Sequence, residues 1–207
     1  MPRVAAAKHE EYAGARRDQI LEAALHIFAR KGFAESTVDE IAVQAGLAKA
    51  TLYLYFPSKE LLLQKLVDHY RLVPDLADLM ESIRSQPPAS GIPTLVAGIW
   101  RQLKEHKDVA HVLVREIFSN PERAKLYNEQ IRLPGQNALA SYLGTWMNQG
   151  SLKKSHPVAS AQCLFGMLWY FLQSQELMGG KELAPLADET ICATVSKIFL
   201  SGASSER

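Results

Sequence analysis

The residues best suited to do chemistry lie between positions 36 and 61, where basic, hydroxyl and aromatic side chains follow one another at short intervals. Lys49 opens a predicted helix, Tyr53 and Tyr55 lie within it, and Lys59 opens the next helix. Cationic and hydroxyl side chains at helix starts bind phosphates, and the first residues of a helix in the major groove reach base edges. The chemistry predicted for this segment is therefore recognition of DNA.

Short-range signals place these side chains on two helices joined by a tight turn. Thr37 and Glu40 have the Thr-x-x-Glu spacing of a capping box, which predicts that a helix begins there. Gly46 is predicted to end this helix, because the residue at that position usually adopts a left-handed conformation that glycine tolerates. A second helix follows from Lys49, and Pro57 stops it. Together they form a helix-turn-helix, the unit that lays its second helix in the major groove.

The helices on either side complete a small domain. A first helix is predicted from about Arg16 to Lys31, with one apolar face turned toward the two short helices. The residues of that face are Ile20, Ala24, Ile27 and Phe28. A fourth helix is predicted from Ser58, which can cap it, to about Tyr70. Leu52 and Phe56 of the second short helix are expected in the core of this domain.

Further helices alternate with short breaks along the rest of the chain, and no convincing strand pattern occurs, so an all-α fold is predicted. Val73-Pro74 marks a domain boundary, since proline disfavours helical geometry in the residue before it. We expect a flexible N-terminal arm over residues 1–15, a helix-turn-helix domain with its connecting helix over residues 16–73, and a C-terminal ligand-binding and dimerisation domain over residues 74–207. Within the last domain, Pro134-Gly135 predicts a kink or break in a long helix.

A run of motifs makes the sequence resemble the DNA-binding region of the TetR family of one-component transcriptional regulators. The motifs are Thr51-Leu52-Tyr53 and Tyr55-Phe56-Pro57-Ser58-Lys59-Glu60, preceded by Thr37 and by Ala45-Gly46. Upstream, Ile20-Leu21-Glu22-Ala23-Ala24 and Phe28-Ala29-x-x-Gly32-Phe33 extend the resemblance, which covers about residues 16 to 62. Ala50 stands where glycine is frequent in the family, and Leu54 where a polar residue is frequent. These departures leave the operator sequence open.

The DNA-binding roles follow from side-chain chemistry and from the resemblance. Lys49 can donate to guanine, and the methyl groups of Ala50 and Thr51 suit a thymine methyl. Thr37 is expected at a phosphate. The resemblance implies phosphate or sugar contacts for Tyr53, Tyr55 and Lys59, although Tyr53 can instead pack in the core with only its hydroxyl exposed. Arg17 can reach the DNA backbone or simply solvate a helix start.

Composition bounds the function without deciding it. The 207 residues are 47% hydrophobic with a net charge of +1, which fits a folded protein and argues against a non-specific DNA-packaging protein. No apolar run approaches the roughly 20 residues of a membrane span, and no signal-peptide core is found, so we expect a cytoplasmic protein without a membrane partner. Cys163 and Cys192 have no metal-ligand or redox spacing and are expected to be buried.

The large C-terminal domain implies a second role, and the resemblance suggests a small-molecule effector site. Candidate lining residues are Trp100, Leu103, Phe118, Tyr127, Tyr142, Trp146, Phe165 and Trp169. Residues of these types at helical spacing are more often plain core. A polar cluster is expected to form a solvated face rather than a metal site; its members are His106, Asp108, His111, Arg115 and Glu116.

The last two long helices carry a wide apolar face, which predicts burial on most sides. The resemblance implies that a second subunit covers part of this face in a four-helix bundle, and a place in the core of the single chain is the alternative. The residues expected at the dimer interface are Leu164, Leu168, Phe171, Leu172, Ile191 and Val195.

These observations predict a homodimeric repressor that binds a palindromic operator on double-stranded DNA and is released by a small apolar or amphipathic ligand. An activator or co-repressed regulator of the same fold is the alternative. A helical enzyme or ligand-storage module is less favoured, because the sequence has no catalytic motif and no pattern that calls for a cofactor or metal.

Overall fold

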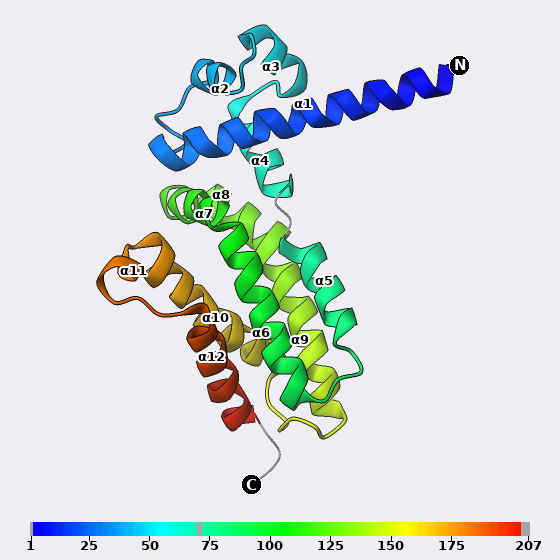
Figure 1. Cartoon of the computed structure of the whole chain (residues 1–207), viewed down its shortest axis with the longest axis vertical. Coiled ribbons are helices and arrows are strands. Elements are labelled where there is room, and N and C mark those ends of the chain that lie inside the picture. The colour runs from blue at the N-terminus through cyan, green and yellow to red at the C-terminus, as the bar shows by residue number, and fades with distance from the viewer. Residues whose placement is uncertain (1, 70–71, 204–207) are drawn as a thin grey trace. The chain divides into compact units, whose positions relative to one another are not determined.

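Helices dominate the structure, a computed structural model that describes residues 2–69 and 72–203 (Figure 1). No strand occurs in these described ranges, which confirms the all-α prediction. The chain divides into two compact units, and each is described here by itself. The first, which we call the head, runs to Tyr70 and adds Asp108–Asn120; the second, the C-terminal unit, comprises Arg71–Lys107 and Pro121–Arg207.

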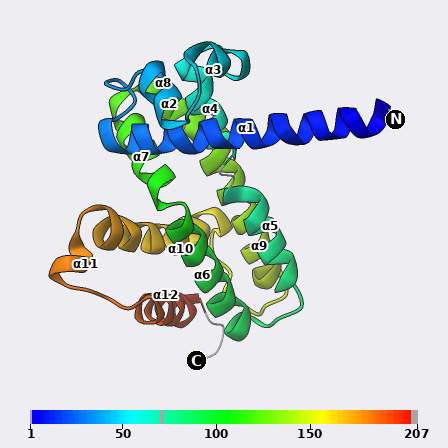
Figure 2. The ribbon, with the colours of Figure 1, turned by 45° about the horizontal axis from the view of Figure 1, so that its top comes forward.

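The head contains α1 (Pro2–Lys31), α2 (Val38–Gln44), α3 (Lys49–Tyr55), α4 (Lys59–His69) and nearly all of α7 (Lys107–Ser119). In both views α2 and α3 lie on the same side of α1 (Figure 1, Figure 2). The division differs from the predicted boundary at Pro74, because α7 is distant in sequence yet packs with the head. Residues 2–15 also differ from the flexible arm expected there, since they continue α1. Their alanine-rich sequence, with Ala5, Ala6 and Ala7 in succession, favours a helix.

One apolar core holds the head together. The predicted face of α1 is buried, with Ile20, Ala24 and Phe28 fully inaccessible to solvent. The other helices add residues to the same core: Ile41 and Ala42, Leu52 and Phe56, Leu62 and Leu66, and Val109 and Val112 of α7. Burying an aliphatic or aromatic side chain of this size stabilises a fold by about 1.5–3 kcal/mol. The core therefore fixes α2 and α3 on α1 and α4.

The C-terminal unit is a layered helical bundle whose long elements are α5 (Leu72–Ser82), α6 (Pro88–Glu105), α9 (Leu133–Asn148), α10 (Pro157–Phe171) and α12 (Asp188–Ala203). Both α5 and α12 pack against α6, and α10 packs against α9 and α12. The short elements are α8 (Pro121–Tyr127), η1 (Asn128–Arg132), η2 (Leu172–Leu177) and α11 (Gly180–Leu183). No helix in the described residues is long and apolar enough to span a membrane.

A π-helical turn, η1, interrupts the long helix where a break was predicted. The amide of Leu133 donates to the carbonyl of Asn128, five residues back, and Pro134 follows in the first turn of α9. Proline lacks an amide hydrogen and its ring clashes with the carbonyl four residues earlier, so the helix widens just before it. The predicted irregularity is therefore found as a π-helical turn within a continuous helical run rather than as a break.

Candidate nucleic-acid interface

The start of α2 is fixed by the capping box that the sequence predicts. The amide of Glu40 donates to Oγ1 of Thr37 at 3.2 Å, and the amide of Thr37 donates to a carboxylate oxygen of Glu40 at 3.0 Å. Each side chain therefore satisfies a backbone donor that the helix leaves free. The hydroxyl predicted to meet a phosphate is exposed, and in the DNA-free chain it serves as this cap.

The turn between α2 and α3 is also held as predicted. Gly46 has φ of 66°, in the left-handed region that glycine adopts without strain. Its amide donates to the carbonyl of Val43, and the next amide, of Leu47, donates to that of Ala42. From α1, the side-chain amide of Gln19 donates to the carbonyl of Ala45 at 2.6 Å. The turn is thereby tied to the first helix.

These constraints turn one face of α3 inward and leave another in solvent. Leu52 and Phe56 are buried, which confirms their predicted place in the core. Tyr53 is 41% exposed and Leu54 is 83% exposed, and Lys49 and Ala50 are exposed in the first turn. Thr51 is half-buried. Exposed apolar and lysine side chains on this helix are suited to the methyl groups and edges of bases.

Two lysines near α2 and α3, Lys49 and Lys31, are paired with acids. Nζ of Lys49 lies 2.9 Å from Oδ2 of Asp39, and this hydrogen bond raises the pKa of Lys49. Lys31 pairs with Glu40, and the hydrogen bond from Lys31 holds the pKa of that carboxyl below its usual value. Both pairs are exposed, so a phosphate group can replace the acid at little cost.

Arg17 and Tyr55, both predicted to bind DNA, lie together in the head. The guanidinium Cζ of Arg17 is 5.9 Å from the centre of the Tyr55 ring, within the range of a cation–π contact. Tyr55 is half-buried against the head core. The contact keeps the guanidinium of Arg17 close to α3.

The phosphate contact expected of Lys59 stays a prediction, and in the structure its ammonium group binds the turn between α1 and α2. Nζ donates to the carbonyl oxygens of Phe33 at 2.6 Å, Ser36 at 2.8 Å and Ala34 at 3.4 Å. It also lies 4.4 Å from the centre of the Phe33 ring. An ammonium group has three hydrogens to donate, and three carbonyls accept them here. In this state Lys59 holds the turn that precedes Thr37.

Helix α7 holds the same turn from the other side, which the sequence did not indicate. Oε1 of Glu116 accepts the amide of Phe33 at 3.2 Å, and Glu116 is only 5% exposed. Gly32 has φ of 84°, and a Cβ placed on it would lie 2.7 Å from Cζ of Arg115. The expected solvated face is therefore wrong for Glu116. No local signal could reveal a contact between residues 83 positions apart.

Several of the predicted effector residues belong to the C-terminal unit, where they occupy different positions. Trp100, Leu103 and Trp146 are buried in its core. The hydroxyl of Tyr142 donates to the carbonyl of Ile83 at 2.9 Å, and its ring packs edge-on against Trp146. The rings of Phe165 and Trp169, both half-buried, stack at 6.0 Å.

The two remaining candidates are Tyr127 and Phe118. Tyr127 is half-buried, and burial raises the pKa of its hydroxyl. The side chain of Phe118 lies outside the described structure, although its backbone is part of α7.

A charged network that the sequence did not indicate lies at the C-terminal end of α6. The Glu176 carboxylate, whose side chain is 6% exposed, is 2.9 Å from Nζ of Lys181, 3.3 Å from that of Lys107 and 3.8 Å from that of Lys104. Lys104 also donates to Asp188 at 2.6 Å. Burial by itself would raise the pKa of Glu176, but the hydrogen bonds from Lys181 and Lys107 hold it below its usual value.

The residues predicted at the dimer interface are buried or half-buried within the single chain instead of exposed on its surface. Leu164, Leu168, Leu172, Ile191 and Val195 are each at most 1% exposed within the single chain, and Phe171 is half-buried. The apolar faces of α10 and α12 pack into the chain's own core, so these leucine, isoleucine and valine side chains cannot reach a second subunit. Cys163 is exposed and Cys192 is half-buried, which corrects their expected burial.

Two family models match the chain. The model described as "Bacterial regulatory proteins, tetR family" matches residues 20–66, which include α2 and α3. The model described as "AefR-like transcriptional repressor, C-terminal domain" matches residues 102–201. Together the two matches cover most of the chain.

Individual proteins show the same similarity. The chain is 29% identical over 115 residues to the HTH-type transcriptional regulator YerO of Bacillus subtilis, which is 54% of this chain and only 40% of YerO. It is 28% identical over 180 residues to YdgC of the same species, covering 84% of this chain and 88% of YdgC. Among solved structures, it resembles the transcriptional regulator FadR from Bacillus subtilis in complex with stearoyl-CoA. That similarity has a TM-score of 0.73 at 25% identity and covers 89% of this chain and 97% of FadR.

Proposed function

Because the chain belongs to the TetR family of bacterial transcriptional regulators, we propose that it acts as a homodimeric repressor that leaves a palindromic operator when a small apolar or amphipathic ligand binds. The members of this family are DNA-binding regulators rather than enzymes. A cytoplasmic location belongs to the same proposal, since a regulator must reach the chromosome.

The observation that carries the proposal is the exposure pattern of α3. A buried Leu52 anchors the helix, while Lys49, Ala50, Tyr53 and Leu54 face solvent from consecutive turns. A helix fixed in this way can enter the major groove with its outward side chains at base edges. One such helix reads only a few base pairs, so a pair of heads on a two-fold site supplies the affinity that one head lacks.

We place the dimer face of this regulator on the outward sides of α10 and α12. Exposed residues recur there at helical spacing: Ala159, Cys163, Gly166 and Tyr170 on α10, and Thr194 and Ile198 on α12. Tyr170 is 67% exposed and Ile198 is 55% exposed, which is unusual for large apolar side chains. Small residues between them let helix backbones approach closely. This face replaces the buried residues that the sequence analysis had assigned.

For the ligand, acyl-chain compounds are the first class to test. The FadR structure that this chain resembles contains stearoyl-CoA. In this chain the half-buried Phe165 and Trp169 rings form an apolar surface on α10 that could contact such a chain. A ligand that binds more tightly to the dimer arrangement unable to bind DNA lowers the affinity for the operator. DNA lowers the affinity for that ligand by the same factor.

Selection of bound sequences from a random DNA pool tests the proposal. We expect the purified protein to enrich a two-fold symmetric site, and Lys49→Ala and Tyr53→Ala to weaken binding to it. Lys154→Ala, an exposed lysine of the C-terminal unit, is the matched control and should bind normally. Lys59 is unsuitable for this test, because it holds the fold of the head.

Release is tested on the selected site with stearoyl-CoA, with binding of the compound followed by calorimetry. We expect loss of the protein–DNA complex at saturating ligand. Retention of the complex by ligand-bound protein would contradict the repressor mechanism and indicate an activator or a co-repressed regulator.

A further inference from the structure

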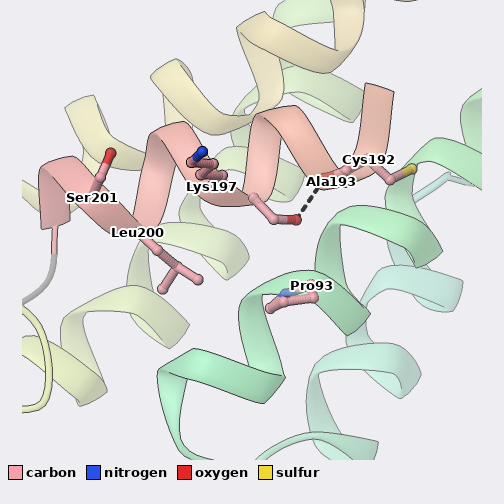
Figure 3. Close-up of a pocket in the computed structure, with 7 residues that line it drawn as sticks. Pro93, Cys192, Ala193, Lys197, Leu200 and Ser201 are labelled. Atoms are coloured by element: carbon pink, nitrogen blue, oxygen red, sulfur yellow. Dashed lines mark hydrogen bonds between the residues drawn. The ribbon is translucent and has the colours of Figure 1, made fainter. Parts of the chain in front are cut away.

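An open groove of about 660 Å³ lies between α6 and α12 on the surface of the C-terminal unit (Figure 3). Pro93 of α6 forms one wall, and successive turns of α12 form the other with Cys192, Ala193, Lys197 and Leu200. The groove contains none of the residues that the sequence analysis assigned to an effector.

The lining is apolar apart from one charge. Oγ of Ser196 donates to the carbonyl of Cys192 at 2.7 Å, as the dashed line in Figure 3 shows, and Oγ of Ser201 donates to that of Ile198 at 3.0 Å. Both hydroxyl donors are therefore used within α12. Burial raises the pKa of the Cys192 thiol, which keeps it neutral.

Lys197 supplies the charge. Its side chain is exposed in the groove wall, and it forms no ion pair with any residue in the described parts of the chain. An unpaired ammonium beside apolar walls is complementary to a molecule with an acidic group and an apolar body. A charge-assisted hydrogen bond to a carboxylate is about twice as strong as a neutral one.

We propose that this groove binds an amphipathic carboxylate, with its apolar chain along Pro93, Cys192 and Leu200 and its carboxylate on the ammonium group of Lys197. The site is separate from the effector site of the proposed repressor mechanism and does not depend on DNA binding. Removal of the chain from water supplies most of the affinity, and the ammonium group selects for the acid.

A second copy of the chain is a poorer occupant of the groove. A two-fold contact centred on Lys197 would bring the Lys197 side chains of two copies near each other, and like charges repel. The proposed dimer face is also distinct, because Thr194 and Ile198 are absent from the groove lining.

Calorimetric titration of the full-length protein, without DNA, tests the proposal with a matched pair of probes. Dodecanoate and dodecanol share a chain length and differ in charge. We expect the wild-type protein to bind dodecanoate about tenfold more tightly than dodecanol, and Lys197→Gln to remove that preference. Lys154→Gln, which removes the same charge elsewhere, should retain it. Equal preference in the wild type and Lys197→Gln would overturn the proposal.

A local readout distinguishes this groove from other sites on the protein. In a Cys163→Ser background, Cys192 is the only remaining thiol, and mass spectrometry can follow its alkylation. We expect dodecanoate to slow alkylation of Cys192 at least severalfold, and Ala193→Trp, which fills the groove, to abolish calorimetric binding there while circular dichroism confirms folding. Unchanged alkylation at saturating dodecanoate would place the ligand elsewhere and refute the site. Protection that depends on protein concentration instead of ligand would show a second copy in the groove and equally refute it.

Discussion

The exposed pairs around α2 and α3 differ from the network around Glu176 in how far apart their partners lie in the sequence. In the head, the pairs around α2 and α3 join close neighbours in sequence: Thr37 with Glu40, Lys31 with Glu40, and Asp39 with Lys49, at most ten residues apart. In the C-terminal unit, Glu176 pairs with Lys107 across 69 residues, and Asp188 with Lys104 across 84. Local pairing leaves charges exposed on one face, while long-range pairing fastens separate helices together.

This difference matches what each region has to do. Exposed pairs in the head can exchange an acid for a DNA phosphate at little cost, because water already solvates both partners. A buried carboxylate with three lysines cannot be released so easily, since loss of its partners would leave an uncompensated charge. The head is therefore suited to a surface contact, and the network around Glu176 to fixing α11 and η2 on α6.

The largest effect is expected from a cavity in the head core. Phe28 is fully buried, so Phe28→Ala should lower the free energy of unfolding by about 3–5 kcal/mol, measured by urea denaturation. DNA binding should be lost with it, because α1 then no longer supports α2 and α3. Leu54→Ala, which shortens a side chain that is 83% exposed, should stay within about 0.5 kcal/mol of the wild type. Equal destabilisation by both changes would show that the head has no fixed core.

A pair of glycines separates local strain from long-range contact. Gly32→Ala and Gly46→Ala both force alanine into a left-handed conformation, which costs about 1–2 kcal/mol. At Gly32 the added methyl group also meets Arg115, whereas nothing lies within 4 Å at Gly46. The melting temperature should therefore fall further in Gly32→Ala than in Gly46→Ala. A larger loss at Gly46 would mean that α7 does not support the turn after α1.

Acid should weaken the C-terminal network through Glu176. The folded-state pKa of this carboxyl lies below its ordinary value of 4.5, so the ionised form stabilises the fold above that pH. The contribution is lost as the pH falls through the lowered pKa. Melting temperature should therefore fall more steeply below pH 4.5 in the wild type than in Glu176→Gln, which is less stable at pH 7. Parallel pH profiles would exclude Glu176 as the cause.

The smallest effect concerns the exposed pair in the head. Lys49→Ala should reduce the slope of log K against log salt concentration for operator binding by about one, because one fewer counterion is released. Asp39→Asn should strengthen binding at low salt, since it frees Lys49 and removes a negative charge beside the phosphates. The comparison needs Lys154→Ala as a neutral reference. A steeper slope for Lys49→Ala would contradict the assigned contact.

Predictions from sequence were accurate where a signal and its consequence are neighbours in the chain. The Thr37 cap, the left-handed Gly46 and the π-helical turn before Pro134 all depend on residues within five positions of one another. The expected solvated face was wrong for Glu116, whose burial against a remote segment carries no local signature. The carbonyl acceptors of Lys59 carry no local signature either, and its phosphate contact stays a prediction.

The apolar helices show the same limit on a larger scale. An apolar face on α10 indicates that something covers it, but periodicity cannot say whether the cover is the same chain or another. The structure places Leu164 and Ile191 in the chain's own core and leaves Tyr170 and Ile198 outside. The helices themselves were predicted, but only the structure shows which of their apolar residues remain exposed in the single chain.

The sequence by itself determined the helices, and the caps and turn that shape α2 and α3, because these depend on short-range sterics and hydrogen bonding. Its motifs also determined the family. Tertiary structure decided which charges are engaged, which apolar faces are covered, that α7 packs with the head, and where an apolar groove opens beside Lys197. The physical reason is that a side chain's type fixes what it can bind, whereas its partner depends on which distant segments folding brings within a few ångströms.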